Sequence, residues 1–211
     1  MSGHGRFITL EGGEGAGKST LLAGLREHLE GRGVDLLLTR EPGGTALGEA
    51  VRAIVLDPTR HELCAESELL LMFASRAQLV RETIAPALAA GQWVLCDRYV
   101  DASYAYQGGG RGQPAERIAA LEQWACAGLK SDLTLLLDLP VTTGRARAAG
   151  RGAADRIEVE ADGFFERVRA TYRARAAAEP QRFRVIDASQ SPEAVLRDAI
   201  AATAHLFGAT S

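Results

Sequence analysis

Short apolar runs alternate with longer stretches of helical spacing along the whole chain. Two of the runs, 34–38 and 133–137, are almost continuously aliphatic, as is typical of strands buried on both faces of a parallel sheet. The runs that we predict to be strands are 7–10, 34–38, 93–96, 133–137 and 184–186. Because helix-length segments separate them, the pattern predicts a three-layer α/β fold with right-handed crossovers between strands.

Helical spacing fills the intervals between the predicted strands. The predicted helices are 19–30, 66–88, 115–126, 164–178 and 193–207. Ser191 is placed to cap the last helix and Pro192 to occupy its first turn, which is a common way for a helix to begin. No internal repeat interrupts this order, so we expect 1–211 to form a single domain.

Polar and charged residues are concentrated just after the predicted strands. In an open parallel sheet, ligands bind at the carboxyl ends of the strands, where such segments meet. A simple connector would not require so many charges. We therefore expect a functional site built from the segments 12–19, 40–45, 97–99 and 145–156.

The overall composition narrows the class of protein. The chain of 211 residues is 46% apolar and 24% charged, with a formal net charge of −3, which argues against a general nucleic-acid binder. No apolar run reaches the roughly 18–20 residues of a membrane helix, and 1–6 lack the apolar core of a signal peptide. Cys64, Cys96 and Cys126 are odd in number and widely spaced, which indicates buried small side chains in a reducing compartment. We expect a cytoplasmic protein with no nucleic-acid or membrane partner.

A glycine-rich segment directly follows the first predicted strand. It reads GGEGAGKS over 12–19 and matches G-x-x-x-x-G-K-[ST], placed between a strand and a helix as a phosphate-binding loop requires. Its backbone N–H groups and the positive end of the next helix attract phosphate oxygens. Lys18 is expected to reach the β- and γ-phosphates of a nucleoside triphosphate, and Ser19 to bind Mg²⁺. The predicted ATP-binding residues are Gly12, Gly13, Glu14, Gly15, Ala16, Gly17, Lys18, Ser19 and Thr20.

The phosphate loop identifies a nucleotide site but not the reaction, because P-loop proteins include GTPases, ATP-driven machines and small-molecule kinases. The sequence has no N-K-x-D guanine motif, which argues against a GTPase. Further motifs are LTREPGGT at 38–45, Asp97–Arg98–Tyr99, AYQGGGRG at 105–112 and Asp155–Arg156–Ile157–Glu158. In their order and spacing, from the phosphate loop to the last helix, these motifs resemble the bacterial thymidylate kinase family, of the type that carries arginines in its lid.

This resemblance implies a P-loop fold with a five-stranded parallel sheet, a homodimer, and phosphoryl transfer from ATP to dTMP, giving dTDP for dTTP synthesis. A kinase for a different nucleotide or nucleoside is the nearest alternative, and a nucleotide-binding switch without turnover is a more distant one. The relative use of dUMP does not follow from the sequence. The apolar helix at 66–90 is either part of the dimer interface or a buried core helix.

For the acceptor base, the resemblance places thymine between the helix around Arg76 and the segment after Tyr99. Arg76 is expected to bind a carbonyl edge of the base, with an aromatic ring stacked on its face, a contact worth about 1–3 kcal/mol. The family often has that ring four residues before the arginine, where this chain has Met72. Phe73, three residues before, is therefore the predicted stacking residue, since both positions share the helix face of Arg76. Core packing is the alternative role for Phe73.

The resemblance also assigns residues around the rest of the pyrimidine nucleotide. Ser103 and Gln107 match positions that read the remaining polar edge of the base. Tyr106 matches a ring that crowds the sugar 2′ position and so favours deoxyribose over ribose. An ordinary packing tyrosine is the alternative at Tyr106.

Charged residues after the second and third predicted strands are the candidates for binding the acceptor phosphate. Arg98 follows the third strand, and its planar fork suits phosphate geometry. Asp97 beside it resembles an acid that supports Mg²⁺ through water. Glu14, Glu41 and Arg52 correspond to positions around the acceptor sugar and phosphate. The alternatives are a surface pair between Asp97 and Arg98, and a solvated charge at Arg52.

An arginine-rich segment at about 143–158 is the predicted lid. It carries arginines between glycines and alanines that suit a mobile cover. Arginines that close over the phosphates would offset negative charge during transfer, although a solvated basic helix gives the same pattern. The arginines of this segment are Arg145, Arg147, Arg151 and Arg156. The predicted catalytic residues are Lys18, Arg98, Arg147, Arg151 and Arg156; no general base is expected, since the acceptor is already a phosphate anion.

Overall fold

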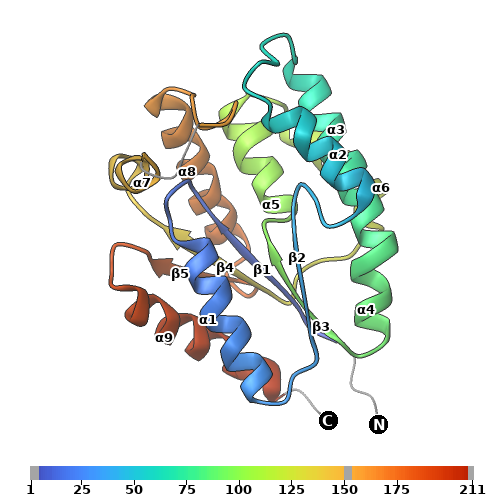
Figure 1. The fold of residues 1–211 in the computed structure, drawn as a ribbon, viewed down its shortest axis with the longest axis vertical. Helices are drawn as coiled ribbons and strands as arrows, with labels where there is room; N and C mark the ends of the chain where they lie inside the picture. Colours follow the sequence, from blue (N-terminus) through green and yellow to red (C-terminus); the bar gives the residue numbers. More distant parts are fainter. Residues whose placement is uncertain (1–4, 150–153, 209–211) are drawn as a thin grey trace.

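A five-stranded, all-parallel sheet forms the centre of the fold (Figure 1). The computed structural model describes residues 5–149 and 154–208, and the strand order is β2-β3-β1-β4-β5. The strands are β1 Phe7–Gly12, β2 Leu36–Arg40, β3 Trp93–Asp97, β4 Leu133–Asp138 and β5 Phe183–Asp187. All five predicted strands are confirmed, and so is the parallel sheet that the family resemblance implied.

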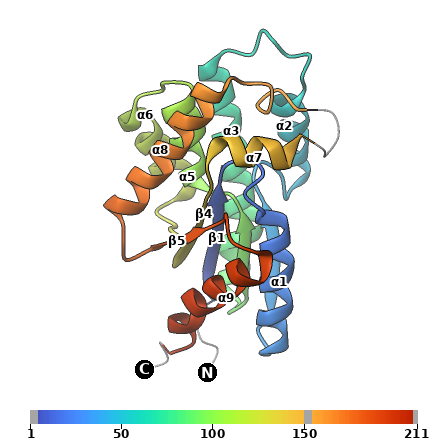
Figure 2. The same ribbon diagram turned by 90° about the vertical axis from the view of Figure 1, so that its left-hand side faces the viewer.

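Helices cover both faces of the sheet, which confirms the three-layer α/β fold (Figures 1 and 2). The helices are α1 Lys18–Gly31, α2 Ala46–Leu56, α3 Ala65–Leu79, α4 Ala85–Ala89, α5 Val100–Ser103, α6 Ala115–Cys126, α7 Val141–Ala148, α8 Asp162–Ala178 and α9 Pro192–Thr203. Alternate residues of β1 point into opposite layers, as the two-residue period of a strand requires. Ile8 and Leu10 share a core with α1 and α9, whereas Phe7 packs in a second core with α3, α4 and α6.

The start of the last helix agrees with the sequence prediction, and the middle of the longest one does not. Ser191 Oγ accepts a hydrogen bond from Ala194 N at 3.3 Å, which confirms the predicted cap. The predicted helix at 66–88 is instead α3 and α4, joined through a π-helical turn at Val80–Ile84. Pro86 lies in the first turn of α4 and has no N–H to donate to that turn.

A second π-helix, Tyr104–Gly110, follows α5 and is not predicted by the sequence pattern, because its three glycines have low helix propensity. Two of the glycines, Gly109 and Gly110, are required by close packing on α8. A Cβ atom on Gly110 would lie 2.4 Å from the ring of Phe164. The π-helix thereby brings the segment that carries Tyr106 and Gln107 against the rest of the fold.

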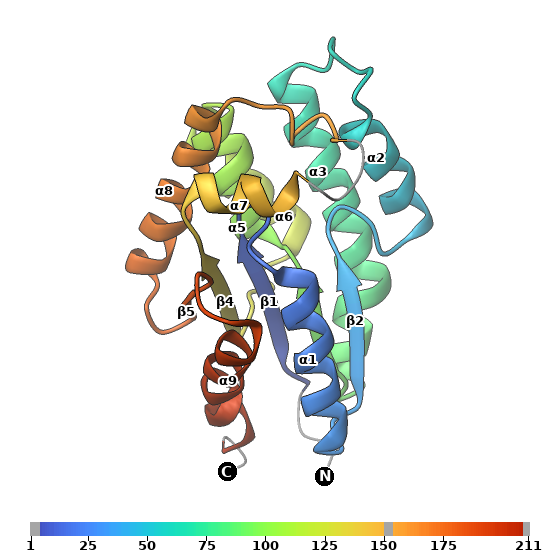
Figure 3. The same cartoon turned by 60° about the vertical axis from the view of Figure 1, so that its left-hand side comes forward.

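The carboxyl ends of the strands carry the segments that were expected to meet. The loop after β1 leads into α1, and α7 crosses above the start of α1 (Figure 3). This helix lies directly on the loop, since a Cβ atom on Gly15 would lie 2.0 Å from the carbonyl oxygen of Gly144. Among residues 5–149 and 154–208, no helix combines the length and the apolar character needed to cross a bilayer.

Candidate active site

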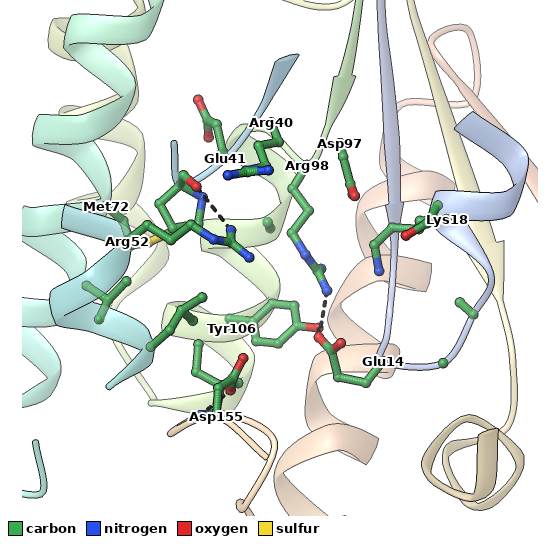
Figure 4. A pocket seen from close by; sticks show the side chains of 18 of the residues that line it. Glu14, Lys18, Arg40, Glu41, Arg52, Met72, Asp97, Arg98, Tyr106 and Asp155 are labelled. Carbon is green, nitrogen blue, oxygen red and sulfur yellow. Dashed lines mark hydrogen bonds and ion pairs between the residues drawn. The ribbon is translucent and has the colours of Figure 1, made fainter. Parts of the chain in front are cut away.

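An open cleft of about 200 Å³ lies at the carboxyl ends of β1, β2 and β3 (Figure 4). Its walls come from the loop after β1, the turn after β2, the end of β3, α2, α3 and the second π-helix. The predicted residues that line it are Glu14, Gly15, Ala16, Gly17, Lys18, Ser19, Glu41, Arg52, Asp97, Arg98, Tyr106 and Gln107. The structure therefore brings together, in one cleft, residues predicted to bind the donor and residues predicted to bind the acceptor.

The loop after β1 has the conformation that its glycines allow. Gly17 precedes α1 with a φ of 91°, in the left-handed region that favours glycine. Lys18 Nζ donates hydrogen bonds to the carbonyl oxygens of Gly12 and Gly13, at 3.1 Å in each case. Burial and then the neighbouring Arg98 lower the pKa of Lys18, while Glu14 and Asp97 act in the opposite direction. A buried ammonium group of this kind is ready to pair with an anion.

Arg98 extends from the end of β3 over the phosphate loop. Its Nη1 donates to the carbonyl oxygen of Gly12 at 2.9 Å, and its Nη2 donates to Glu14 Oε1 at 2.6 Å. The backbone of Arg98 has a φ of 71°, a left-handed conformation that costs a non-glycine residue about 1–2 kcal/mol. A hydrogen bond from its N–H to the Leu10 carbonyl at 2.9 Å holds this conformation. The strain directs a guanidinium group into the cleft.

Glu14, the acidic residue of the phosphate loop, is stabilised by two donors. Tyr106 Oη donates to Glu14 Oε1 at 2.8 Å, beside the bond from Arg98. The guanidinium carbon of Arg98 also lies 4.8 Å from the centre of the Tyr106 ring. Burial raises the pKa of Tyr106 well above its ordinary value, so the phenol remains a donor. Arg98, Glu14 and Tyr106 thus form one connected group at the wall of the cleft.

Further positive charge lies along the side of the cleft formed by the turn after β2. Arg52 Nη1 donates to the carbonyl oxygen of Pro42 at 3.1 Å, and burial together with Arg40 lowers the pKa of Arg52. Arg40 lines the cleft and pairs with Glu49 at 3.0 Å. With Lys18 and Arg98, these side chains surround the cleft with cations (Figure 4). Such a site suits more than one phosphate group.

Arg76 lies beneath the cleft and does not line it. Its side chain is 0% exposed, and its Nε donates to Glu41 Oε2 at 2.7 Å. Its Nη1 donates to Ser103 Oγ at 2.9 Å, and its Nη2 to the Tyr99 carbonyl at 3.1 Å. Burial raises the pKa of Glu41, and Arg76 opposes that shift. In the structure, Arg76 and Ser103 therefore form a buried polar layer together with Glu41.

The expected stacking role of Phe73 is corrected by the structure. Phe73 belongs to the hydrophobic core and is 3% exposed, with its ring 4.6 Å from the guanidinium carbon of Arg76. Met72 lines the cleft instead. Successive residues of an α-helix point about 100° apart, so only one of the two side chains can face the cleft. The thioether of Met72, a flexible apolar group, supplies the wall that was assigned to an aromatic ring.

The side chains at the end of the phosphate loop fit a magnesium ion that is held together with nucleotide phosphates. Ser19 and Asp97 line the same cleft, and Asp97 Oδ1 is buried without a hydrogen-bond partner in the described part of the chain. No group of three or more His, Cys, Asp or Glu side chains able to hold a metal is found within 5–149 and 154–208. A hydroxyl and one carboxylate suit Mg²⁺, which keeps waters and phosphate oxygens as its other ligands.

The predicted lid arginines are separated by the structure. Arg147, on α7, donates from Nη1 to the Ala188 carbonyl at 2.9 Å and lines a second cavity of about 290 Å³ with Gly15, Gly17 and Thr20. Arg145 donates to the Glu160 carbonyl at 2.5 Å. Arg147 is thus next to the phosphate loop, but on the side away from the main cleft. Arg151 lies outside the described residues.

Arg156 does not reach the phosphate loop. Its Nε donates to the Val55 carbonyl at 2.9 Å, and its Nη2 pairs with Glu68. The reason is that Glu68 is a fully buried carboxylate, 1% exposed, which requires a cation beside it. Glu68 was not among the predicted site residues, although an acidic residue next to the apolar run Leu69–Phe73 is the kind of signal that indicates a buried partner.

Glu11 is a second buried carboxylate that the sequence analysis missed. It lies on β1, accepts a hydrogen bond from the Tyr99 N–H at 2.8 Å, and accepts another from Tyr172 Oη at 2.7 Å. Burial and then the neighbouring Asp101 raise the pKa of Glu11 to about 8. Tyr172 Oη also accepts a hydrogen bond from Arg98 Nη1 at 3.2 Å. Glu11 therefore supports Arg98 from below through Tyr172.

Comparison with known proteins agrees with this geometry. The sequence profile of the family described as Thymidylate kinase matches residues 10–199. A protein named thymidylate kinase from Alkalilimnicola ehrlichii is 60% identical over 193 residues, which cover 91% of this chain and 89% of that protein. Proteins of the same name from Pseudomonas putida and Alcanivorax borkumensis are 59% and 54% identical, over 92% and 90% of this chain and 92% of each relative. The chain belongs to the thymidylate kinase family.

Proposed function

We propose that this protein transfers the γ-phosphoryl group of ATP to dTMP, which gives dTDP and ADP in the synthesis of dTTP. The observation that carries the proposal is the position of Arg98. Its guanidinium group bonds to Gly12 and Glu14 of the phosphate loop and lines the cleft that Lys18 also lines. A cation suited to an acceptor phosphate therefore stands beside the loop that binds the donor phosphates.

The donor is ATP with Mg²⁺. Loop N–H groups, the start of α1 and Lys18 bind its phosphates, while Ser19 and Asp97 would hold the magnesium ion. The metal supplies charge neutralisation at the phosphate oxygens. The second cavity, which Arg147 lines together with Gln190 and Pro192, continues from the loop and accommodates the nucleoside of the donor.

The acceptor is dTMP, with its phosphate toward Arg98 and Arg52 and its base toward Met72 and Gln107. Arg76 and Ser103, beneath the cleft, form the buried polar layer that holds Glu41 at the base end. Tyr106 and Glu14 lie between the two ends, where the deoxyribose would pass. Tyr106 then excludes a ribose 2′-hydroxyl by its bulk.

Catalysis rests on position and charge. An oxygen of the acceptor phosphate attacks the γ-phosphorus, the bond to the β–γ bridging oxygen breaks, and ADP leaves with that oxygen. Lys18 and Arg98 compensate the negative charge from two directions. Arg147, beside the phosphate loop, adds positive charge from the side of α7, and Arg151 stays a predicted lid residue outside the described part of the chain.

The acting form is a homodimer in the cytoplasm. Leu70 on α3 and Trp124 on α6 are 58% and 79% exposed, on two helices that pack against each other. Large apolar side chains in such positions favour contact with a second copy. Sedimentation of the wild type and of a Trp124→Glu variant tests this assembly, with a shift toward monomer expected for the variant.

Steady-state kinetics test the proposed reaction. With ATP and Mg²⁺, dTMP is expected to be the preferred acceptor over UMP and over purine monophosphates, with formation of dTDP detected directly. Preference for a purine monophosphate would refute the acceptor. Binding of ATP without any ADP release in the presence of dTMP would instead identify a nucleotide-dependent switch.

A further inference from the structure

Within 5–149 and 154–208, the side-chain amide of Gln107 forms hydrogen bonds through its nitrogen and not through its oxygen. Gln107 lines the cleft and is 1% exposed. Its Nε2 donates to Glu68 Oε1 at 2.8 Å. Its Oε1 is buried and has no hydrogen-bond partner within the described residues. A buried carbonyl oxygen without a donor is unfavourable, so this oxygen is an acceptor that a ligand can satisfy.

The hydrogen bond to Glu68 fixes the orientation of the Gln107 amide, so the carbonyl oxygen of the amide is the atom left to bind a ligand. The oxygen and nitrogen of a glutamine amide have almost the same shape, so only their hydrogen-bond partners fix the orientation. A carboxylate accepts hydrogen bonds and cannot donate them. The NH₂ group of Gln107 must therefore face Glu68, and its carbonyl oxygen must face away.

Two arginines hold Glu68 in this role. Arg156 Nη2 and Arg111 Nε both pair with Oε2 of Glu68, the latter at 3.2 Å. The other carboxylate oxygen of Glu68, Oε1, accepts the hydrogen bond from Gln107. The two carboxylate oxygens are thus divided between charge compensation and orientation of the amide. Glu68 is 1% exposed and does not line the cleft, so it acts on a ligand only through its neighbours.

We propose that Glu68 is a positioning residue that sets the base specificity of the acceptor site, an inference that rests on the proposed function. By fixing the amide of Gln107, it presents a hydrogen-bond acceptor to the base. Thymine and uracil carry a hydrogen on N3 and satisfy that acceptor. Cytosine has a lone pair on N3, so two acceptors would face each other and dCMP is rejected.

The test compares three acceptors in competition. In Glu68→Gln, residue 68 offers both a donor and an acceptor, so the Gln107 amide can turn and present its NH₂ group. The ratio of kcat/KM for dTMP to that for dCMP is expected to fall by about tenfold or more. The ratio for dTMP to dUMP should not change, because both bases carry the N3 hydrogen. Ratios measured in one mixture do not depend on how much of the enzyme is folded.

A double-mutant cycle shows whether the effect passes through Gln107. In a Gln107→Ala background, Glu68→Gln is expected to leave the dTMP to dCMP ratio unchanged. Arg111→Met is the matched control, since it removes a partner of Oε2 and leaves the bond from Gln107 in place. It should retain the wild-type ratio. If Glu68→Gln does not fold, Glu68→Gln combined with Arg156→Met removes the uncompensated cation, and the same fall in ratio is expected.

The outcomes separate the two proposals. A wild-type enzyme that phosphorylates dTMP, with an unchanged dTMP to dCMP ratio in Glu68→Gln, overturns the role of Glu68 and leaves the function standing. The acceptor for N3 would then be elsewhere, for example Glu41 Oε1, which is also buried without a partner in the described residues. A wild-type enzyme that does not phosphorylate dTMP refutes the proposed function itself.

Discussion

Two arginine–glutamate pairs border the same cleft and differ in how far water reaches them. Arg98 and Glu14 are 2.6 Å apart at the phosphate end, with side chains 16% and 25% exposed. Arg76 and Glu41 are also 2.6 Å apart, beneath the base end, with side chains 0% and 2% exposed. The separation of the charged groups is the same in both pairs, so this distance does not distinguish them.

Because the two pairs differ in exposure to water, we expect them to have different functions. A partly hydrated arginine can exchange its carboxylate partner for a phosphate, because water and substrate compensate both charges during the exchange. A fully buried pair is fixed, since separating it leaves an uncompensated charge in a medium of low polarity. We therefore expect Arg98 to affect the rate of transfer, and Arg76 to affect the stability of the pocket.

The largest effect is expected from Arg98→Ala. Loss of the guanidinium group should lower the rate of the chemical step by about 10³-fold or more, the range for a phosphate-stabilising arginine. The unfolding temperature should stay near that of the wild type, because the side chain is partly exposed and its backbone is strained. Single-turnover kinetics with dTMP and thermal unfolding measure the two quantities.

Arg98→Gly is the control for the backbone at this position. It lacks the same guanidinium group but adopts a φ of 71° without strain, so it should be equally inactive and about 1 kcal/mol more stable than Arg98→Ala. An Arg98→Ala enzyme that retains a rate within about tenfold of the wild type would show that the phosphate end is misassigned.

Arg76→Met should act mainly on stability. It leaves Glu41 buried without its cation, which is expected to cost about 3–5 kcal/mol of the free energy of unfolding. Urea unfolding measures this loss, and Arg76→Met combined with Glu41→Met should recover part of it. A stability loss no larger than that of Arg98→Ala would remove the distinction between the two pairs.

The buried carboxyl of Glu11 should make stability depend on pH. Its pKa is about 8 in the folded chain against 4.5 as the ordinary value, so the folded state keeps a proton that the unfolded state has released. The free energy of unfolding should therefore fall as the pH rises from 5 to 8, by an amount on the order of 2–4 kcal/mol from this group.

Glu11→Gln tests this dependence, because it cannot titrate. The stability difference between wild type and variant should shift in favour of the variant as the pH rises through this window. Parallel curves for the two proteins, measured by urea unfolding at several pH values, would contradict the assignment.

The smallest effect is expected at Tyr106, between the two pairs. Tyr106→Ala removes the ring and should lower the preference for dTMP over UMP by about tenfold. Tyr106→Phe keeps the ring and loses only the hydrogen bond to Glu14, so it should retain the preference and lose at most several-fold in kcat/KM. Equal selectivity in wild type and Tyr106→Ala would exclude a role in choosing deoxyribose.

The parts of the site that follow from local sequence could be predicted. The phosphate loop is fixed by glycines, Lys18 and a neighbouring strand and helix, all within one short segment. Arg98 was identified because it directly follows a strand, and the carboxyl end of a strand in a parallel sheet faces the ligand. The five strands were found because each contains a short apolar run, and the three central ones, β1, β3 and β4, are buried on both faces.

Other parts depend on tertiary contacts that spacing does not reveal. Phe73 and Met72 are adjacent on α3, and only the rotation of that helix against the sheet determines which of them faces the cleft. Arg156 was assigned to the phosphates by its charge, but a buried carboxylate from α3 binds it. That carboxylate, Glu68, is distant in sequence from its partners. The position of Arg151 is not described, so its role stays a prediction.

A crystal structure with dTMP and a non-hydrolysable ATP analogue would show directly whether Arg98 binds the acceptor phosphate while Arg76 stays paired. We expect the dTMP phosphate to lie within hydrogen-bond distance of Arg98 and to take the place of Glu14 as its partner. We also expect Arg76 to remain paired with Glu41. A dTMP phosphate bound away from Arg98 would contradict the proposed role of Arg98 in transfer. An Arg76–Glu41 pair opened by the nucleotide would contradict the proposed structural role of Arg76.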